Sequence, residues 1–141
     1  MFKKWIFRFL IGVLYLGLAS CSGSASNTGG TITVTMTADE YSFTSSMTTF
    51  VVGQKYHFEV TNNGQVPHEV MLVKPIEAGT MDMEEMDEMA LAHIEEDDLP
   101  AGATSSMDYT FTEPAPAGTL EFACHLTGHY EAGMVLPIVV Q

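Results

Sequence analysis

The sequence predicts an all-β domain, a Greek-key β-sandwich of about eight short strands with one helical insertion. Three observations support this class. Between residues 31 and 141, apolar side chains recur at every second position over short runs, which is the period of a half-buried strand. Turn-forming Gly, Pro, Asn and Asp residues separate these runs. One segment, residues 81–98, is instead rich in Met, Glu, Ala and Leu, which favour a helix.

Four strands are expected in the first half of this domain, over residues 31–37, 40–44, 49–52 and 54–61. Alternation predicts that one face of each strand points into the core. The side chains expected to point inward are Ile32, Val34, Met36, Tyr41, Phe43, Tyr56, Phe58 and Val60. His57 alternates with the inward set, so we expect it to face solvent rather than to bind metal.

The second half of the domain is expected to add strands over residues 66–73, 104–112, 119–123 and 133–140. Pro137 lies inside the last of these, and proline cannot donate a ladder hydrogen bond, so that strand should lie at an edge or contain a bulge. The alternating apolar residues in this half are Met107, Tyr109, Phe111, Leu120 and Phe122.

The segment 81–98 predicts the helical insertion. Asp82 and Glu85 suit an N-cap and its capping partner. An amphipathic stripe follows, consisting of Met83, Met86, Ala90 and Ile94 with Met89 and His93 beside it. The stripe has two interpretations: a buried helix face in which Met fills gaps, or a second, thioether-based Cu(I) site. Helical packing requires this spacing, so we favour packing.

Residues 1–21 are typical of a bacterial lipoprotein signal. Three basic residues precede an apolar run over 9–18 that is too short for a spanning helix. The run ends in Leu-Ala-Ser-Cys, which resembles a lipobox cleaved before Cys21, whose thiol then carries the lipid. An uncleaved N-terminal anchor is the alternative. Residues 22–30 have the composition of a flexible linker, which leaves 31–141 as one domain.

The charge balance of the chain is strongly acidic. Without residues 1–21, two basic residues stand against 18 acidic ones, a formal charge of −16. This argues against nucleic acid as a partner and favours redox proteins with a basic docking surface, although acidity also serves solubility. We expect a monomer on the outer side of a bacterial membrane, in the periplasm or at the cell surface, held there by the lipid anchor.

Four soft donors define the candidate metal site. Cys124, His129 and Met134 are spaced five residues apart, and His68 lies upstream beside the turn Asn62–Gly64. Two His, one Cys and one Met form the donor set that copper takes in electron-transfer sites. If Cys21 is acylated, Cys124 has no partner for a disulfide, and an unpaired thiol in an exported domain is explained if it binds a metal.

Two other chemistries compete for these residues. Structural zinc takes Cys and His, but it rarely takes a thioether. A catalytic cysteine paired with a histidine needs neither Met134 nor His68. Copper uses all four donors, and four protein donors leave no open position for a substrate, so the site should pass electrons rather than make or break bonds. We therefore expect no enzyme activity.

The segments Asn62–Leu72 and Gly118–Val140 resemble the cupredoxins, the small blue-copper proteins, and particularly their auracyanin-like and plastocyanin-like members. The resemblance implies a cupredoxin-like sandwich that carries electrons with one type 1 copper, and it implies four ligands: His68, Cys124, His129 and Met134. It also implies that His129 is the electron port, with Leu126 and Pro67 as candidates for an apolar surface around it.

Two residues depart from or complicate this resemblance. Cupredoxins commonly carry Asn directly after the first ligand His, where it ties the two ligand loops together, and this chain has Glu69 at that position. His125 follows Cys124, but Ala123 precedes it and the chain contains no His-x-His motif, so we do not expect His125 to bind metal. The predicted function is a membrane-tethered Cu(I)/Cu(II) electron carrier or an accessory subunit of a larger redox enzyme. The alternative is an extracytoplasmic copper-binding or trafficking protein.

Overall fold

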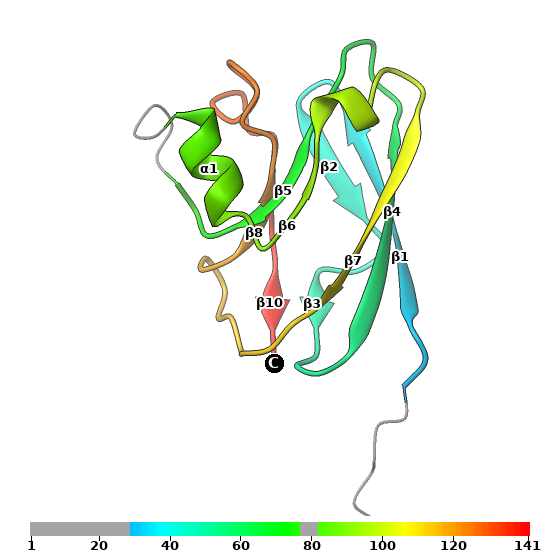
Figure 1. Cartoon of the computed structure of the whole chain (residues 1–141), viewed down its shortest axis with the longest axis vertical. Coiled ribbons are helices and arrows are strands. Elements are labelled where there is room, and N and C mark those ends of the chain that lie inside the picture. Colours follow the sequence, from blue (N-terminus) through cyan, green and yellow to red (C-terminus); the bar gives the residue numbers. More distant parts are fainter. Residues whose placement is uncertain (1–28, 77–81) are drawn as a thin grey trace, which may run out of the picture.

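Two four-stranded sheets and a two-stranded pair form the predicted β-sandwich (Figure 1). The structure is a computed structural model that describes residues 29–76 and 82–141. Its strands are β1 (Ile32–Asp39), β2 (Ser42–Ser45), β3 (Thr49–Phe50), β4 (Lys55–Asn62), β5 (Val70–Val73), β6 (Ala92–Ile94), β7 (Thr104–Thr110), β8 (Glu121–Ala123), β9 (Val135–Pro137) and β10 (Val139–Val140). The sheets have the orders β2-β1-β4-β7 and β6-β5-β8-β9, and β10 pairs with β3.

The core lies between the two sheets and is built from the alternating residues. On β4 the pattern is as predicted, because Tyr56, Phe58 and Val60 are buried while the residues between them are not. Phe58 of the first sheet meets Phe122 of the second with ring centroids 5.1 Å apart. This aromatic contact joins the two layers and excludes water from the interior.

Two expected core residues are in fact exposed. Ile32 is 41% exposed, because it occupies the first position of β1 at the end of the sheet. Tyr41 is 53% exposed, and the prediction that it shares a buried face with Phe43 is wrong. Strand β2 begins at Ser42, so the alternation that buries Phe43 does not extend to Tyr41.

The central strands of the second sheet, β5 and β8, are buried on both faces. All four residues of β5 are buried. Val70 and Leu72 belong to the cluster between the sheets, whereas Met71 and Val73 pack in a second cluster with Met86 of helix α1 (Met83–Met89). Helix α1 therefore covers the outer face of this sheet (Figure 1).

The insertion differs from the prediction of one long helix. Asp82 caps α1 as expected, and its Oδ1 accepts a hydrogen bond from the backbone N–H of Glu85 at 2.9 Å. The helix ends at Met89, and the chain then forms strand β6 and a 3-10 turn, η1 (Glu96–Asp98). The open edge of β5 accounts for the early end, because β6 pairs with it antiparallel and no basic residue stabilises the last helical turn.

Only part of the predicted Met stripe is packed. Met86 is buried against β5, as the packing interpretation requires, but Met89 is 48% exposed. Ile94 is buried as a residue of β6 rather than of a helix.

The last part of the chain forms two short strands rather than one. The predicted last strand is divided into β9 and β10, and Pro137 lies on β9, an edge strand of the second sheet, as expected. The predicted signal, Cys21 and most of the linker lie outside the described residues. Within the described ranges, no helix is long and apolar enough to cross a membrane.

Candidate metal centre

Strand pairing places the candidate ligands at one end of the second sheet. Strands β5 and β9 both run antiparallel to β8, so the start of β5, the end of β8 and the start of β9 meet. His68 precedes β5 by two residues, Cys124 directly follows β8, and Met134 directly precedes β9. Residues far apart in the sequence are therefore fixed side by side by the sheet register.

The loop from Cys124 to Met134 closes on itself through the backbone. The N–H of Cys124 donates to the carbonyl of Met134 at 3.1 Å, and the N–H of Met134 donates to the carbonyl of His129 at 3.0 Å. Gly133 has a φ of 101°, a left-handed conformation that a side chain would strain. These bonds fix His129 relative to the two strand ends.

Three of the four predicted ligands bring their donor atoms together. His68, Cys124 and His129 each offer one atom, and these atoms lie within 4.8 Å of one another. Nδ1 of His129 is 3.3 Å from Nδ1 of His68 and 3.4 Å from Sγ of Cys124. Met134 is fully buried in the same core cluster as Cys124.

The segment before His68 is held by a buried amide. The side chain of Asn62 donates to the carbonyls of Val66 and Leu99 and accepts from the N–H of Gly64 at 2.8 Å. Gly64 is required by close approach, because a Cβ there would lie 2.9 Å from Nε2 of His68. The sequence marks these residues only as a turn, because their role in seating His68 depends on contacts that only the fold creates.

Burial determines the protonation of the donors. It raises the pKa of the Cys124 thiol to about 11, although hydrogen bonds from backbone groups oppose the shift. Burial also lowers the pKa of His68, with help from nearby His129. At neutral pH without metal, the site therefore holds a neutral imidazole at His68 and a protonated thiol.

These residues fit copper. Cys124 is fully buried and forms no disulfide within the described part of the chain, and it faces two imidazole nitrogens rather than a carboxylate cage. A mixed sulfur and nitrogen donor set suits copper, whereas Mg²⁺ and Ca²⁺ require oxygen donors.

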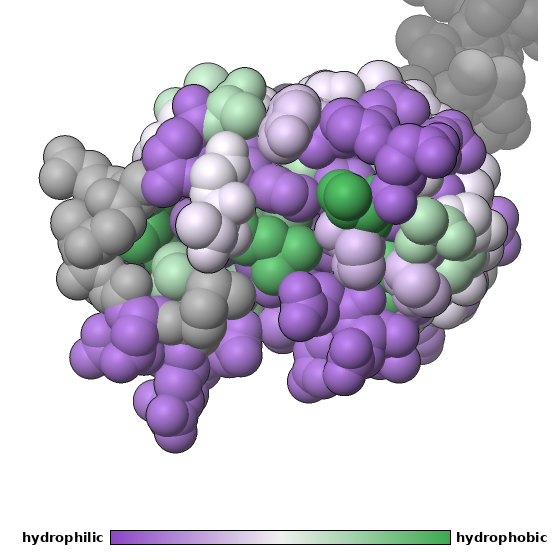
Figure 2. All heavy atoms as spheres, turned by 90° about the horizontal axis from the view of Figure 1, so that it is seen from above, coloured by the Kyte–Doolittle hydropathy of each residue, from purple (hydrophilic) through white to green (hydrophobic). Residues whose placement is uncertain are grey.

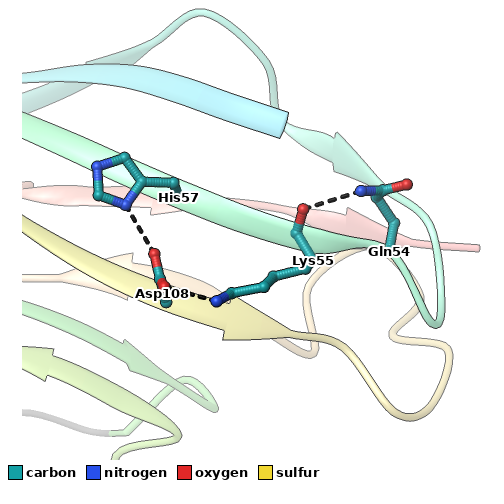
Figure 3. A network of polar contacts seen from close by, with 4 residues as sticks. All are labelled: Gln54, Lys55, His57 and Asp108. Carbon is teal, nitrogen blue, oxygen red and sulfur yellow. Dashed lines mark hydrogen bonds and ion pairs between the residues drawn. The ribbon is translucent and has the colours of Figure 1, made fainter. Parts of the chain in front are cut away.

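His57 lies away from this centre, as expected. Its Nδ1 is 2.6 Å from Oδ1 of Asp108 on the neighbouring strand β7, and Lys55 contacts the other carboxylate oxygen at 2.8 Å (Figure 3). The two basic groups, first Lys55 and then His57, hold the pKa of Asp108 below its ordinary value. This partly exposed network follows from the register of β4 and β7.

His125 also lies outside the donor group formed by His68, Cys124 and His129. Its ring stacks on Tyr130, with centroids 4.4 Å apart and planes 14° apart. Burial lowers the pKa of His125. That His125 does not bind the metal stays a prediction.

The surface beside the centre is mixed in character. Figure 2 views this end of the domain and shows small apolar groups among hydrophilic residues. Val66 is 40% exposed, and Leu126, a residue of the Cys124–Met134 loop, is partly buried. The exposed ring of Tyr41 meets His129 edge-on at 5.5 Å, a contact that the sequence did not predict because the two residues are joined only by the fold.

A two-sheet β-sandwich in which one thiol and two imidazoles converge at a strand end is the arrangement of a cupredoxin metal centre. Residues 30–141 match the copper binding proteins of the plastocyanin/azurin family. The chain belongs to this family, and its cofactor is copper.

Similar proteins agree with this class. The "Copper-resistant cuproprotein CopI" of Rubrivivax gelatinosus is 33% identical over 121 residues, covering 84% of this chain and 71% of that protein. Auracyanin from Roseiflexus castenholzii is 20% identical with a TM-score of 0.60, covering 80% of this chain and 99% of its own. Rusticyanin from Thiobacillus ferrooxidans is 16% identical with a TM-score of 0.60, covering 81% of this chain and 79% of its own. The last two share the fold.

The raised pKa of Cys124 predicts that copper binding depends on pH. A thiolate ligand must lose its proton, so loading should release about one proton from Cys124 and the apparent affinity should rise about tenfold per pH unit between pH ~7 and ~9. Copper titrations at several pH values, with a weak chelator as competitor, measure this slope. The variant Cys124→Ser is the control and should lose the slope. A flat profile for the unmodified protein would contradict the assignment.

Proposed function

We propose that this protein is a one-electron carrier with a single type 1 copper, and that it is not an enzyme. His68, Cys124 and His129 would hold the copper as strong ligands, and Met134 would be a weak fourth donor. The observation that carries the proposal is the convergence of one thiol and two imidazoles within 4.8 Å, of which Cys124 and His68 are buried. Four protein donors exclude substrate from the metal, which favours electron transfer over bond chemistry.

The residues of the centre have separate tasks. Bound copper supplies the Cu(I)/Cu(II) couple. Cys124, fully buried, provides the thiolate and keeps water out. His68 is held by the segment that Asn62 braces, so its ring does not have to move when the charge of the site changes. A donor set held rigid in this way lowers the reorganisation that accompanies electron transfer.

Electrons should enter and leave at His129, which is partly exposed while His68 and Cys124 are buried. Val66, Pro67 and Leu126 supply apolar surface nearby, and Tyr41 contacts the His129 ring. The acidic balance of the chain supports a redox partner with a basic docking surface, and we expect that encounter to weaken as ionic strength rises.

The N-terminal sequence supports attachment to the outer side of a bacterial membrane through a lipid on Cys21. If this is correct, Cys21→Ser blocks both acylation and cleavage at the lipobox, so a precursor of higher mass should accumulate and incorporation of labelled fatty acid should stop. Immunoblots and fatty-acid labelling of cell fractions measure both. The uncleaved anchor would be favoured by two results together: Cys21→Ser has the same mass as the unmodified protein, and the unmodified protein incorporates no labelled fatty acid.

Ligand substitutions test the carrier directly. Cys124→Ser should abolish the intense visible colour of the Cu(II) form, because that colour requires a thiolate donor. Met134→Leu should keep the colour and raise the reduction potential, because removing a weak donor disfavours Cu(II) more than Cu(I). Visible spectra and voltammetry check both. Irreversible voltammetry of the unmodified protein, or loss of copper from Met134→Leu, would count against this ligand set.

Copper capture or trafficking is the second candidate function. The relative from Rubrivivax gelatinosus is named a copper-resistant cuproprotein, and this chain has ten Met residues, of which Met89 is 48% exposed on α1. A trafficking protein would bind Cu(I) at the helix in addition to the main centre.

Metal stoichiometry separates the two functions. For the electron carrier we expect one Cu(I) per chain, unchanged when Met83, Met86 and Met89 are replaced by Leu. Equilibrium dialysis against Cu(I), followed by metal analysis, gives the ratio. A ratio above one that falls to one in the triple variant would establish the capture function.

A further inference from the structure

Glu69 is a buried carboxylate between the metal loop and the inserted segment. It directly follows His68, and its side chain is only 3% exposed. Oε1 accepts a hydrogen bond at 2.7 Å from the backbone N–H of His125, the residue after Cys124. One carboxylate oxygen thus ties the segment of the first histidine to the loop of the cysteine. A buried carboxylate is costly unless its charge is also balanced.

The second oxygen of Glu69 faces a histidine from the insertion. Oε2 lies 3.8 Å from Nε2 of His93, which is an ion-pair distance rather than a hydrogen bond. His93 is placed there by strand β6, where it is paired with Met71 of β5. The other ring nitrogen of His93 is 3.6 Å from Oδ1 of Asp87 on α1.

The surroundings of His93 favour a positive charge. The Glu69 carboxylate raises the pKa of His93, and Asp87 adds to this, while burial acts in the opposite direction. The pair lines a cavity of about 340 Å³, whose wall also contains Glu95, Glu96 and Asp97. Glu69 differs from these three because it is buried and bonded to the metal loop, whereas they are exposed.

We propose that Glu69 and His93 form a positioning pair in which the balance of the two charges tunes the reduction potential, in addition to the link between the ligand loops that this position commonly makes in cupredoxins. An amide at position 69 would preserve the link to His125 but would bring no charge. The carboxylate would place a negative charge beside a bound copper and so favour Cu(II), and His93, which faces it at ion-pair distance, would offset that charge when protonated. This inference rests on the proposed ligand set.

Voltammetry of a matched pair of variants tests the proposal. Glu69→Gln keeps an acceptor for the His125 N–H but removes the charge, so the potential should rise while the visible band remains. Asp97→Asn removes an exposed carboxylate from the same cavity and should shift the potential less. Glu69→Ala removes the link as well and should lower the affinity for Cu(II) by about 10- to 100-fold.

His93→Gln provides a test of opposite sign. This variant removes the group that can carry the positive charge and keeps a polar partner for Glu69, so the reduction potential should fall. It also tests the proposal if a Glu69 variant does not fold. Thermal unfolding of the metal-free proteins shows whether each variant is folded. Equal shifts in Glu69→Gln and Asp97→Asn, or no shift in His93→Gln, would overturn the proposal. If the unmodified protein lacked the visible band, the proposed function itself would fail instead.

Discussion

The pairing of β8 with β5 and β9 is the constraint on which the metal centre depends. It aligns the segment before β5, the end of β8 and the start of β9, and so places His68, Cys124 and Met134 at one end of the sheet. A slip of one residue would turn these side chains to the opposite face. Burial of both faces of β5 prevents such a slip, because the sandwich core covers one face and α1 covers the other.

The same arrangement holds the donors in place. His68 is seated by the Asn62 hydrogen bonds, and the backbone of the Cys124–Met134 loop closes on itself. Burial keeps the thiol protonated and favours the neutral form of His68, so the metal-free site carries little charge. Folding therefore already orders part of the site, so copper binding costs less conformational entropy.

Much of this was predictable because the signals are local. Alternation identified β4 and its buried residues, and the even spacing of Cys124, His129 and Met134 marked the metal loop. The features that the sequence did not reveal arise from contacts between segments that are distant in the chain. The helix was predicted too long because β6 is stabilised by the edge of β5, and neither the Tyr41–His129 contact nor the Glu69–His93 pair leaves a periodic pattern.

The central claim is that one copper is held by the Cys124 thiolate and the imidazoles of His68 and His129. The most direct measurement is the combined visible and EPR spectrum of the purified protein loaded with one equivalent of Cu(II). A thiolate-ligated centre should give an intense visible charge-transfer band together with an unusually small copper hyperfine splitting. A pale sample with only weak absorption and the large splitting of ordinary tetragonal Cu(II) would contradict the account.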